Sequence, residues 1–304
     1  MRLGDRSSAL RKFSSNNSAA QGRAILSVHQ KSRARDRSRH QCIGEPKTHA
    51  SQAFIIPLAC LCLITLAGCS SGAKEAPKKP AAVQYFHPDP ATAGVLKGVV
   101  HYAGKKPTRK VVDMSSDPAC EATHKSKVFN DTIIVNPDGT LANVFVYIRS
   151  GLEGKQFEVP QTPVAFDQRG CWFISRVVGV QTGQIIHITN SDPVNHNLHA
   201  LAQTNREWNH SQPPEEGPID RKFLKPEVMI PVKCNIHGWM HAYIGVVDHP
   251  YFAVTGADGS FELRNVPPGD YVIEAWQEQM GKIEQKVTLP PSGNIDVGFT
   301  FKGE

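Results

Sequence analysis

Four side chains that could bind a metal ion occur in two short segments of this sequence. Residues 233–240 (KCNIHGWM) place a thiol at Cys234, an imidazole at His237 and a thioether at Met240, in the spacing Cys-x2-His-x2-Met. About 40 residues upstream, a second imidazole at His196 follows an expected strand in the segment SDPVNHN. Two imidazoles and one thiolate in a trigonal plane, with a weak axial thioether, are the ligands of a mononuclear copper site that transfers single electrons. The pattern therefore predicts one copper ion at these four residues.

Other uses of the same side chains are open from the sequence alone. A two-copper centre would need a second cysteine on the ligand loop, which holds Cys234 alone. Structural zinc or copper storage could use Cys234 with both imidazoles and either His199 or His241 as a fourth ligand. Copper delivery to an oxidase would share the four ligands of the electron-transfer site. On a strand, residue 199 points away from residue 196, so we expect His199 outside the site. We expect His241 near the mouth of the site at most, and Trp239 to pack against or shield it.

The order His196-Asn197 followed by Cys-x2-His-x2-Met resembles the cupredoxins, over roughly residues 160–247. The short ligand loop is similar to that of amicyanin, and the His-Asn pair to that of the plastocyanins. The resemblance implies a Greek-key β-sandwich with copper near one end, and one-electron transfer as the function. It also implies that Asn197 ties the two ligand loops together by hydrogen bonding, which is how outer groups tune a metal.

The rest of the chain after residue 93 reads as short strands separated by turn signals, which is typical of an all-β sandwich protein. Expected strands, or segments that hold them, are 95–104, 132–135, 141–151, two about Thr182-Gly183 within 177–192, 228–234 and 242–248. The segment 202–225 is polar and rich in proline, so we expect a long irregular loop there.

The tail carries a different pattern. FAVT with DGSFEL and then VPPGDY, within 252–271, resembles the carboxypeptidase regulatory-like module, a small transthyretin-like β-sandwich. LKGVVHYAGKKP (96–107) is similar to its opening strand. Residues 93–159 and 248–304 are thus expected to build one regulatory-like sandwich that the cupredoxin part interrupts or packs against; a separate C-terminal domain is the alternative. Such modules are non-catalytic scaffolds that sometimes bind glycans or proteins, so a cell-surface binding scaffold is the second candidate function.

The N-terminal segment indicates export. Residues 1–68 combine a long Ser- and Arg-rich leader with a 16-residue apolar run at 53–68, which is short for a membrane span and suits a signal peptide. The run ends in LAGC, which resembles the bacterial lipoprotein signal and implies lipidation of Cys69. We expect a disordered leader with translation starting downstream of Met1, a signal helix, and a tether over 69–92. Ser70 is not acidic, so the outer membrane is preferred as the site of this periplasmic anchor.

Charge and cysteine usage narrow the function classes. The leader takes 11 of the 34 basic residues, and residues 69–304 carry a net charge of −2, without a basic stripe. Nucleic acid is therefore an unsuitable partner; the expected partners are the membrane and a redox protein. No catalytic triad or pair of acids is evident, so we expect no enzyme.

An oxidising periplasm permits one disulfide, and Cys120–Cys171 is the expected bridge, with two buried free thiols as the alternative. Closing that loop would stabilise the fold by about 4 kcal/mol.

Overall fold

The computed structural model describes residues 82–303, and these residues are all-β apart from one short helix. The leader, the signal segment, Cys69 and most of the 69–92 tether lie outside the described residues. The elements in chain order are β1 (Gly94–Ala103), α1 (Pro118–Ala122), β2 (Phe145–Ser150), β3 (Val164–Gln168), β4 (Val177–Gln181), β5 (Ile186–Asn190), β6 (His196–Ala200), β7 (Trp208–Gln212), β8 (Ile219–Arg221), β9 (Glu227–Lys233), β10 (His241–Val247), β11 (Phe252–Val254), β12 (Ser260–Val266), β13 (Gly269–Gln277), β14 (Gly281–Leu289), β15 (Asn294–Asp296) and β16 (Phe299–Lys302).

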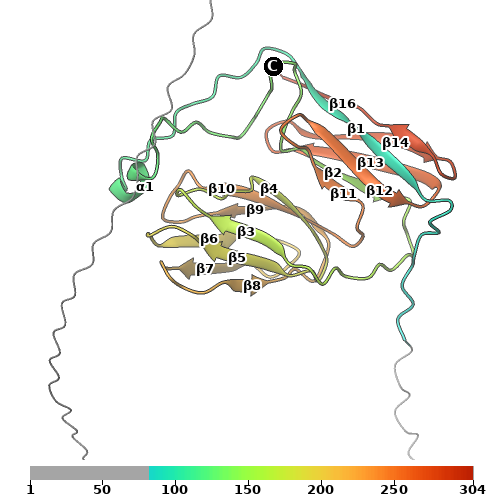
Figure 1. Cartoon of the computed structure of the whole chain (residues 1–304), viewed down its shortest axis with the longest axis horizontal. Helices are drawn as coiled ribbons and strands as arrows, with labels where there is room; N and C mark the ends of the chain where they lie inside the picture. The colour runs from blue at the N-terminus through green and yellow to red at the C-terminus, as the bar shows by residue number, and fades with distance from the viewer. Residues whose placement is uncertain (1–81, 304) are drawn as a thin grey trace, which may run out of the picture. The chain divides into compact units, whose positions relative to one another are not determined.

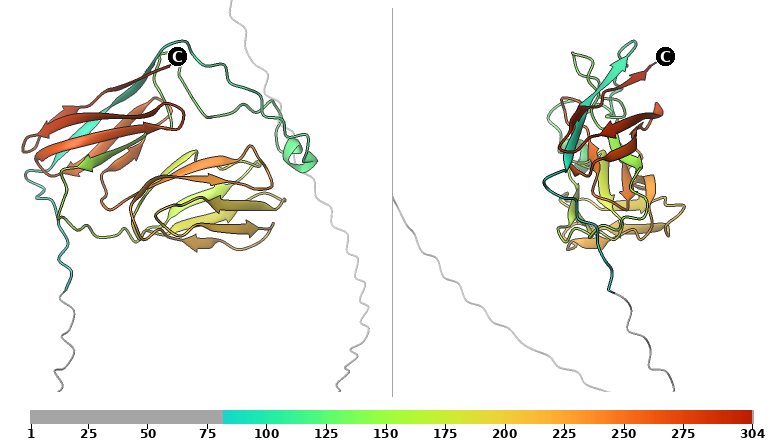
Figure 2. Two further views of the ribbon diagram at one scale, coloured as in Figure 1. Left: turned by 180° about the vertical axis from the view of Figure 1, so that it is seen from behind. Right: turned by 90° about the vertical axis from the view of Figure 1, so that its right-hand side faces the viewer.

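Strands from both ends of the described chain form one sandwich, which we call the terminal sandwich. One sheet has β1 between β12 and β15, with β16 also paired to β1, and the other runs β11-β2-β13-β14. The early strand β1 thus lies against strands more than 150 residues later, which Figures 1 and 2 show as teal beside orange and red. Alternating apolar side chains from both sheets, including Leu96, Ile148, Ile273 and Phe299, fill one core.

Strands β3 to β10 form a second sandwich, which we call the middle sandwich. A five-stranded sheet in the order β4-β10-β9-β6-β7 shares a core with the three-stranded sheet β3-β5-β8. The chain crosses between the two sheets from β3 to β6 and again from β7 to β9, whereas β6–β7 and β9–β10 are neighbours within the five-stranded sheet. The pairs β4–β10 and β3–β5 are parallel while the others are antiparallel. Such crossings between two sheets are expected of the Greek-key arrangement that the cupredoxin resemblance implied. Its apolar core includes Phe166, Ile188, Leu198 and Ile244.

The two sandwiches belong to one compact unit and pack directly against each other. The Phe145 ring of β2 lies on a glycine pair, Gly179 of β4 and Gly245 of β10, which are register partners. A Cβ at residue 245 would come within 2.6 Å of that ring, so only glycine permits this approach. Beside it, Arg176 makes a bidentate ion pair with Glu278 from the β13–β14 turn, at 2.8 and 2.6 Å, and both side chains are buried.

Two of the expected element assignments were wrong. The segment 202–225, expected to be an irregular loop, contains β7 and β8, which lie at the edges of their sheets. An edge strand pairs with a neighbour on one side only and commonly carries polar or charged side chains, so a polar sequence can form it. The segment 132–135, expected to be a strand, makes only an isolated bridge between Val135 and Leu141. Within residues 82–303, no helix is long and apolar enough to cross a membrane.

Candidate metal centre

The sheet register brings the two predicted ligand segments to the same end of the middle sandwich. His196 is the first residue of β6, and Cys234 directly follows β9. These strands pair antiparallel, with His199 opposite Lys233, so the start of β6 lies beside the loop after β9. That loop returns into β10 at His241 and is closed by two backbone hydrogen bonds. The N–H of Met240 donates to the carbonyl of His237 at 3.0 Å, and that of Cys234 donates to the carbonyl of Met240 at 3.1 Å.

The sulfur of Cys234 is held by backbone donors from both segments. The N–H groups of His237 and Asn197 each lie 3.4 Å from Sγ. The Asn197 side chain accepts from the Asn235 N–H at 3.0 Å, so Asn197 joins the two loops as the resemblance implied. Burial acts to raise the pKa of the Cys234 thiol, but hydrogen bonds from His196 and from these backbone donors lower it to about 7. The site therefore favours a thiolate.

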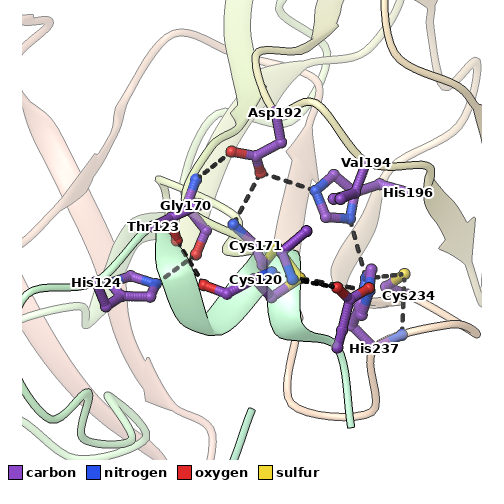
Figure 3. Close-up of a disulfide and its surroundings, with 12 residues drawn as sticks. Cys120, Thr123, His124, Gly170, Cys171, Asp192, Val194, His196, Cys234 and His237 are labelled. Carbon is purple, nitrogen blue, oxygen red and sulfur yellow. Dashed lines mark hydrogen bonds and ion pairs between the residues drawn. A yellow bond between two sulfur atoms is a disulfide. The ribbon is translucent and has the colours of Figure 1, made fainter. Parts of the chain in front are cut away.

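The two imidazoles and the sulfur converge on one buried point. Nδ1 of His196 lies 3.0 Å from Nδ1 of His237, and Sγ of Cys234 lies 3.8 Å from the latter. The three donor atoms lie within 4.8 Å of one another, and the three residues are at most 2 % exposed. Figure 3 shows the rings and the sulfur turned toward each other. Met240 is fully buried in the same apolar cluster as Cys234.

The outer nitrogen of each imidazole faces a carboxylate. Oδ2 of Asp192 lies 2.8 Å from Nε2 of His196, and Oδ2 of Asp117 lies 3.1 Å from Nε2 of His237. Burial would raise the pKa of Asp192, but hydrogen bonds from His196 and from backbone N–H groups lower it. The hydrogen bond from His237, followed by that from the Cys120 N–H, lowers the pKa of Asp117. Both carboxylates are therefore ionised.

The carboxylates decide which ring nitrogens carry protons. An ionised carboxylate only accepts hydrogen bonds, so Nε2 of His196 and Nε2 of His237 must each be protonated. In neutral imidazoles, both Nδ1 atoms are then bare acceptors, facing each other beside a thiolate. Such a cluster attracts a metal ion or a proton. Without a metal ion a proton takes that place: burial acts to lower the pKa of His196, but hydrogen bonds to Asp192 and Cys234 raise it to about 9.

The donor chemistry fits copper. Thiolate, thioether and neutral imidazole are the ligand types that copper uses in electron-transfer sites. The two other candidates for a ligand lie outside the cluster. Nδ1 of His199 bonds the Asn235 side chain at 3.2 Å and its Nε2 bonds Glu207 at 2.6 Å, so both nitrogens are occupied. His241 is exposed.

The shielding expected of Trp239 matches its position. Its ring centroid lies 5.1 Å from that of His237, and Nε1 donates to the carbonyl of Cys171 at 3.0 Å.

The sequence reading missed both carboxylates. Asp192 lies four residues before His196, so its spacing was a usable signal. Asp117 is 120 residues from His237, and no local pattern links them. The structure joins Cys120 and Cys171 in a disulfide whose Cα atoms are 5.5 Å apart, beside the site. Sγ of Cys120 lies 3.5 Å from Nε2 of His237.

Comparison with solved structures finds partial likenesses to copper proteins. A copper-containing nitrite reductase from Thermus scotoductus SA-01 matches with 19% identity and a TM-score of 0.27, over 33% of this chain and 25% of that one. An oxidised amicyanin variant matches with 17% identity and a TM-score of 0.26, over 33% of this chain and 97% of that one. A purple cupredoxin from Nitrosopumilus maritimus has 14% identity and a TM-score of 0.24, over 27% and 98%. No family model and no curated protein matches.

Proposed function

We propose that this protein is a one-electron carrier with a mononuclear type-1 copper centre. His196, Cys234 and His237 would be the strong ligands, and Met240 the axial one. The observation that carries the proposal is the pair of Nδ1 atoms 3.0 Å apart beside a thiolate, with both Nε2 atoms committed to carboxylates. A proton can join one pair of these three electron-rich atoms, whereas a metal ion would bind all three. When bound there, copper supplies exchange of one electron between Cu(II) and Cu(I).

Copper suits the donors better than zinc does. Structural zinc sites with one cysteine need additional strong ligands to complete a tetrahedron. The imidazoles of His199 and His241, which could have served, lie outside the cluster. A buried thioether at Met240 is a weak ligand for zinc and a familiar axial group for copper. The same residues therefore favour a redox ion over a structural one.

Burial favours electron transfer over catalysis or copper delivery. His196 is fully buried, and His237 and Cys234 are 2 % exposed. Catalytic metal sites keep a coordination position open to substrate, whereas four protein ligands in a buried cluster leave none. Handing copper to an acceptor protein would require opening this cluster. A closed centre whose ligands are fixed by the β6–β9 register can still exchange electrons, so we propose no enzymatic activity.

We also propose that the carrier is lipid-anchored on the periplasmic side of a bacterial membrane, with the outer membrane preferred. The LAGC segment ending at Cys69 supports the anchor, and the Cys120–Cys171 disulfide fits an oxidising compartment. The partner would be another redox protein. The terminal sandwich would serve as a scaffold, and glycan binding by it is the rival function.

Copper titration of the detergent-solubilised, metal-free protein tests the proposal. One equivalent of Cu(II) should produce an intense visible thiolate-to-copper absorption, which one electron from a reductant removes. Cys234→Ser should abolish the band, and Met240→Leu should keep it while shifting the reduction potential. His199→Gln is the matched control because it removes a nearby imidazole outside the cluster. A colourless copper complex, or tighter binding of zinc than of copper, would refute the redox function.

A further inference from the structure

The two carboxylates that face the imidazoles are both held by the cysteines of the disulfide. The N–H of Cys120 donates to Oδ1 of Asp117 at 3.2 Å, and the N–H of Cys171 donates to Oδ2 of Asp192 at 2.8 Å. Each carboxylate has one more backbone donor, from Ala119 at 3.0 Å and from Gly170 at 2.6 Å. The bridge thus joins the two residues whose backbone N–H groups hold these carboxylates; Figure 3 shows the Asp192 side of this arrangement.

The two carboxylates differ in what attaches them to the site. Asp192 precedes β6 by four residues and belongs to the middle sandwich. Asp117 comes from the segment between β1 and β2, two strands of the terminal sandwich, and caps the five-residue helix α1. The direct covalent link between α1 and the middle sandwich is the Cys120–Cys171 bridge. His124 adds a hydrogen bond to the carbonyl of Gly170 at 2.7 Å.

We propose that Asp117 is a positioning residue for His237 and that the Cys120–Cys171 disulfide fastens it there. This inference rests on the proposed copper function. Asp117 keeps the proton of His237 on Nε2 and so leaves Nδ1 free to bind the metal ion. Its negative charge increases the electron donation of the imidazole, which stabilises Cu(II) more than Cu(I). The disulfide acts through Asp117 because it supplies a donor to that carboxylate and holds α1 against the site.

Asp117→Asn removes the negative charge of this side chain while keeping its role as a helix cap. Asparagine is as good a helix cap as aspartate and still accepts a hydrogen bond, so α1 should remain formed. We expect Cu(II) affinity to fall about 10- to 100-fold, as for other partners of metal-bound histidines. Cu(I) affinity should change less, so the reduction potential should rise by about 59 mV for each tenfold difference between the two. Glu121→Gln, which removes an exposed charge from the same helix, is the control and should change neither quantity.

A double-mutant cycle tests the role of the disulfide. Replacing Cys120 and Cys171 together by serine should shift Cu(II) affinity and potential in the same direction as Asp117→Asn. Combining the two changes should add little, because both act on the same carboxylate. Asp192→Asn, which acts on the other imidazole, should instead add its effect to that of Asp117→Asn. Full additivity of the serine pair with Asp117→Asn would show that the disulfide does not act through Asp117.

A metal-free measurement separates this inference from the copper proposal. Nitrogen NMR of the His237 ring in the metal-free protein should show the proton on Nε2, and Asp117→Ala should redistribute it between the two nitrogens. If the protein forms its copper band but Asp117→Asn leaves affinity, potential and the ring tautomer unchanged, Asp117 is only a helix cap and the inference fails. If the native protein shows no copper–thiolate band, the proposed function fails, while the NMR result still decides the positioning role.

Discussion

The two sandwiches bury polar groups in opposite ways. In the terminal sandwich, Glu274 accepts from the hydroxyl of Tyr147 at 2.9 Å and pairs with Lys282 at 3.2 Å and Arg149 at 3.4 Å. Acceptor meets donor, so the group is satisfied and rigidifies the fold. In the middle sandwich, two acceptor nitrogens and a thiolate face one another. Within residues 82–303, the gathered sets of metal-ligating side chains all belong to this one region.

The contrast separates stability from function. A buried polar group that finds its partner inside the protein needs nothing further, and removing it mainly costs stability. A set of buried acceptors without a donor is costly until an ion or a proton joins it, so it marks a binding site. The terminal sandwich should therefore influence how firmly the protein folds, and the middle sandwich should determine what it binds. Four predictions test this division.

The largest expected effect is a loss of stability without a change in the metal centre. Phe299 is 1 % exposed in the core of the terminal sandwich and packs on Phe261. Phe299→Ala should lower the free energy of unfolding by about 3–5 kcal/mol through lost burial and the cavity left behind. Denaturant unfolding measures the loss, and copper titration of the folded protein should give an unchanged absorption band. A shifted band would mean that the terminal sandwich shapes the centre.

The second prediction concerns the ion pair that joins the sandwiches. Glu278→Gln leaves the buried Arg176 guanidinium with Asp131, 3.0 Å away, as its remaining acidic partner. The expected cost is about 3 kcal/mol, at the lower end for a broken buried pair because Asp131 remains. Calorimetry should then resolve separate unfolding transitions for the two sandwiches.

Glu262→Gln is the control for that change. It removes the partner of the exposed Arg264 within the terminal sandwich, and such surface pairs contribute little. A single cooperative transition in Glu278→Gln would show that apolar contacts such as Phe145 on the glycine pair suffice to couple the sandwiches.

The third prediction is that metal binding stabilises one sandwich. Copper at about 100 times its dissociation constant should add about 2.7 kcal/mol to the stability of the metal-binding state. In Glu278→Gln, where the transitions separate, only that of the middle sandwich should move to higher temperature. Cys234→Ser should remove the shift. Equal movement of both transitions would place a second copper site in the terminal sandwich or outside the described residues.

The sequence was enough to predict the local features of this site, and not those that depend on distant pairing. Cys234, His237 and Met240 lie within seven residues, so their spacing fixes a loop that any sheet would present. The position of His196 beside this loop was implied by the resemblance of the ligand pattern to the cupredoxins. Asp117 lies beside α1, which is joined to a residue 51 positions later in the chain by the disulfide, and nothing in the residues around Asp117 indicates that pairing. The edge strand β7 was missed for a related reason, since its alternating exposure reads as a polar loop until its neighbour β6 is known.

The smallest expected effect is a pH dependence of the protein's stability that arises from a histidine at the junction of the two sandwiches. His249, just after β10, donates from Nε2 to the carbonyl of Ile148 at 2.8 Å and accepts from the Tyr251 N–H at Nδ1, 3.2 Å away. The bond accepted at Nδ1 needs the neutral ring, and burial lowers the pKa of His249 below its ordinary 6.5. Below about pH 6.5, His249 is protonated in the unfolded chain but stays neutral in the folded protein. The free energy of unfolding therefore decreases as the pH is lowered, by up to about 1.4 kcal/mol per pH unit. It levels off once the pH passes below the folded-state pKa.

Denaturant titrations of the metal-free protein between about pH 6.5 and 5 should show this slope. His249→Gln should remove it, whereas an unchanged slope would assign the dependence to other groups.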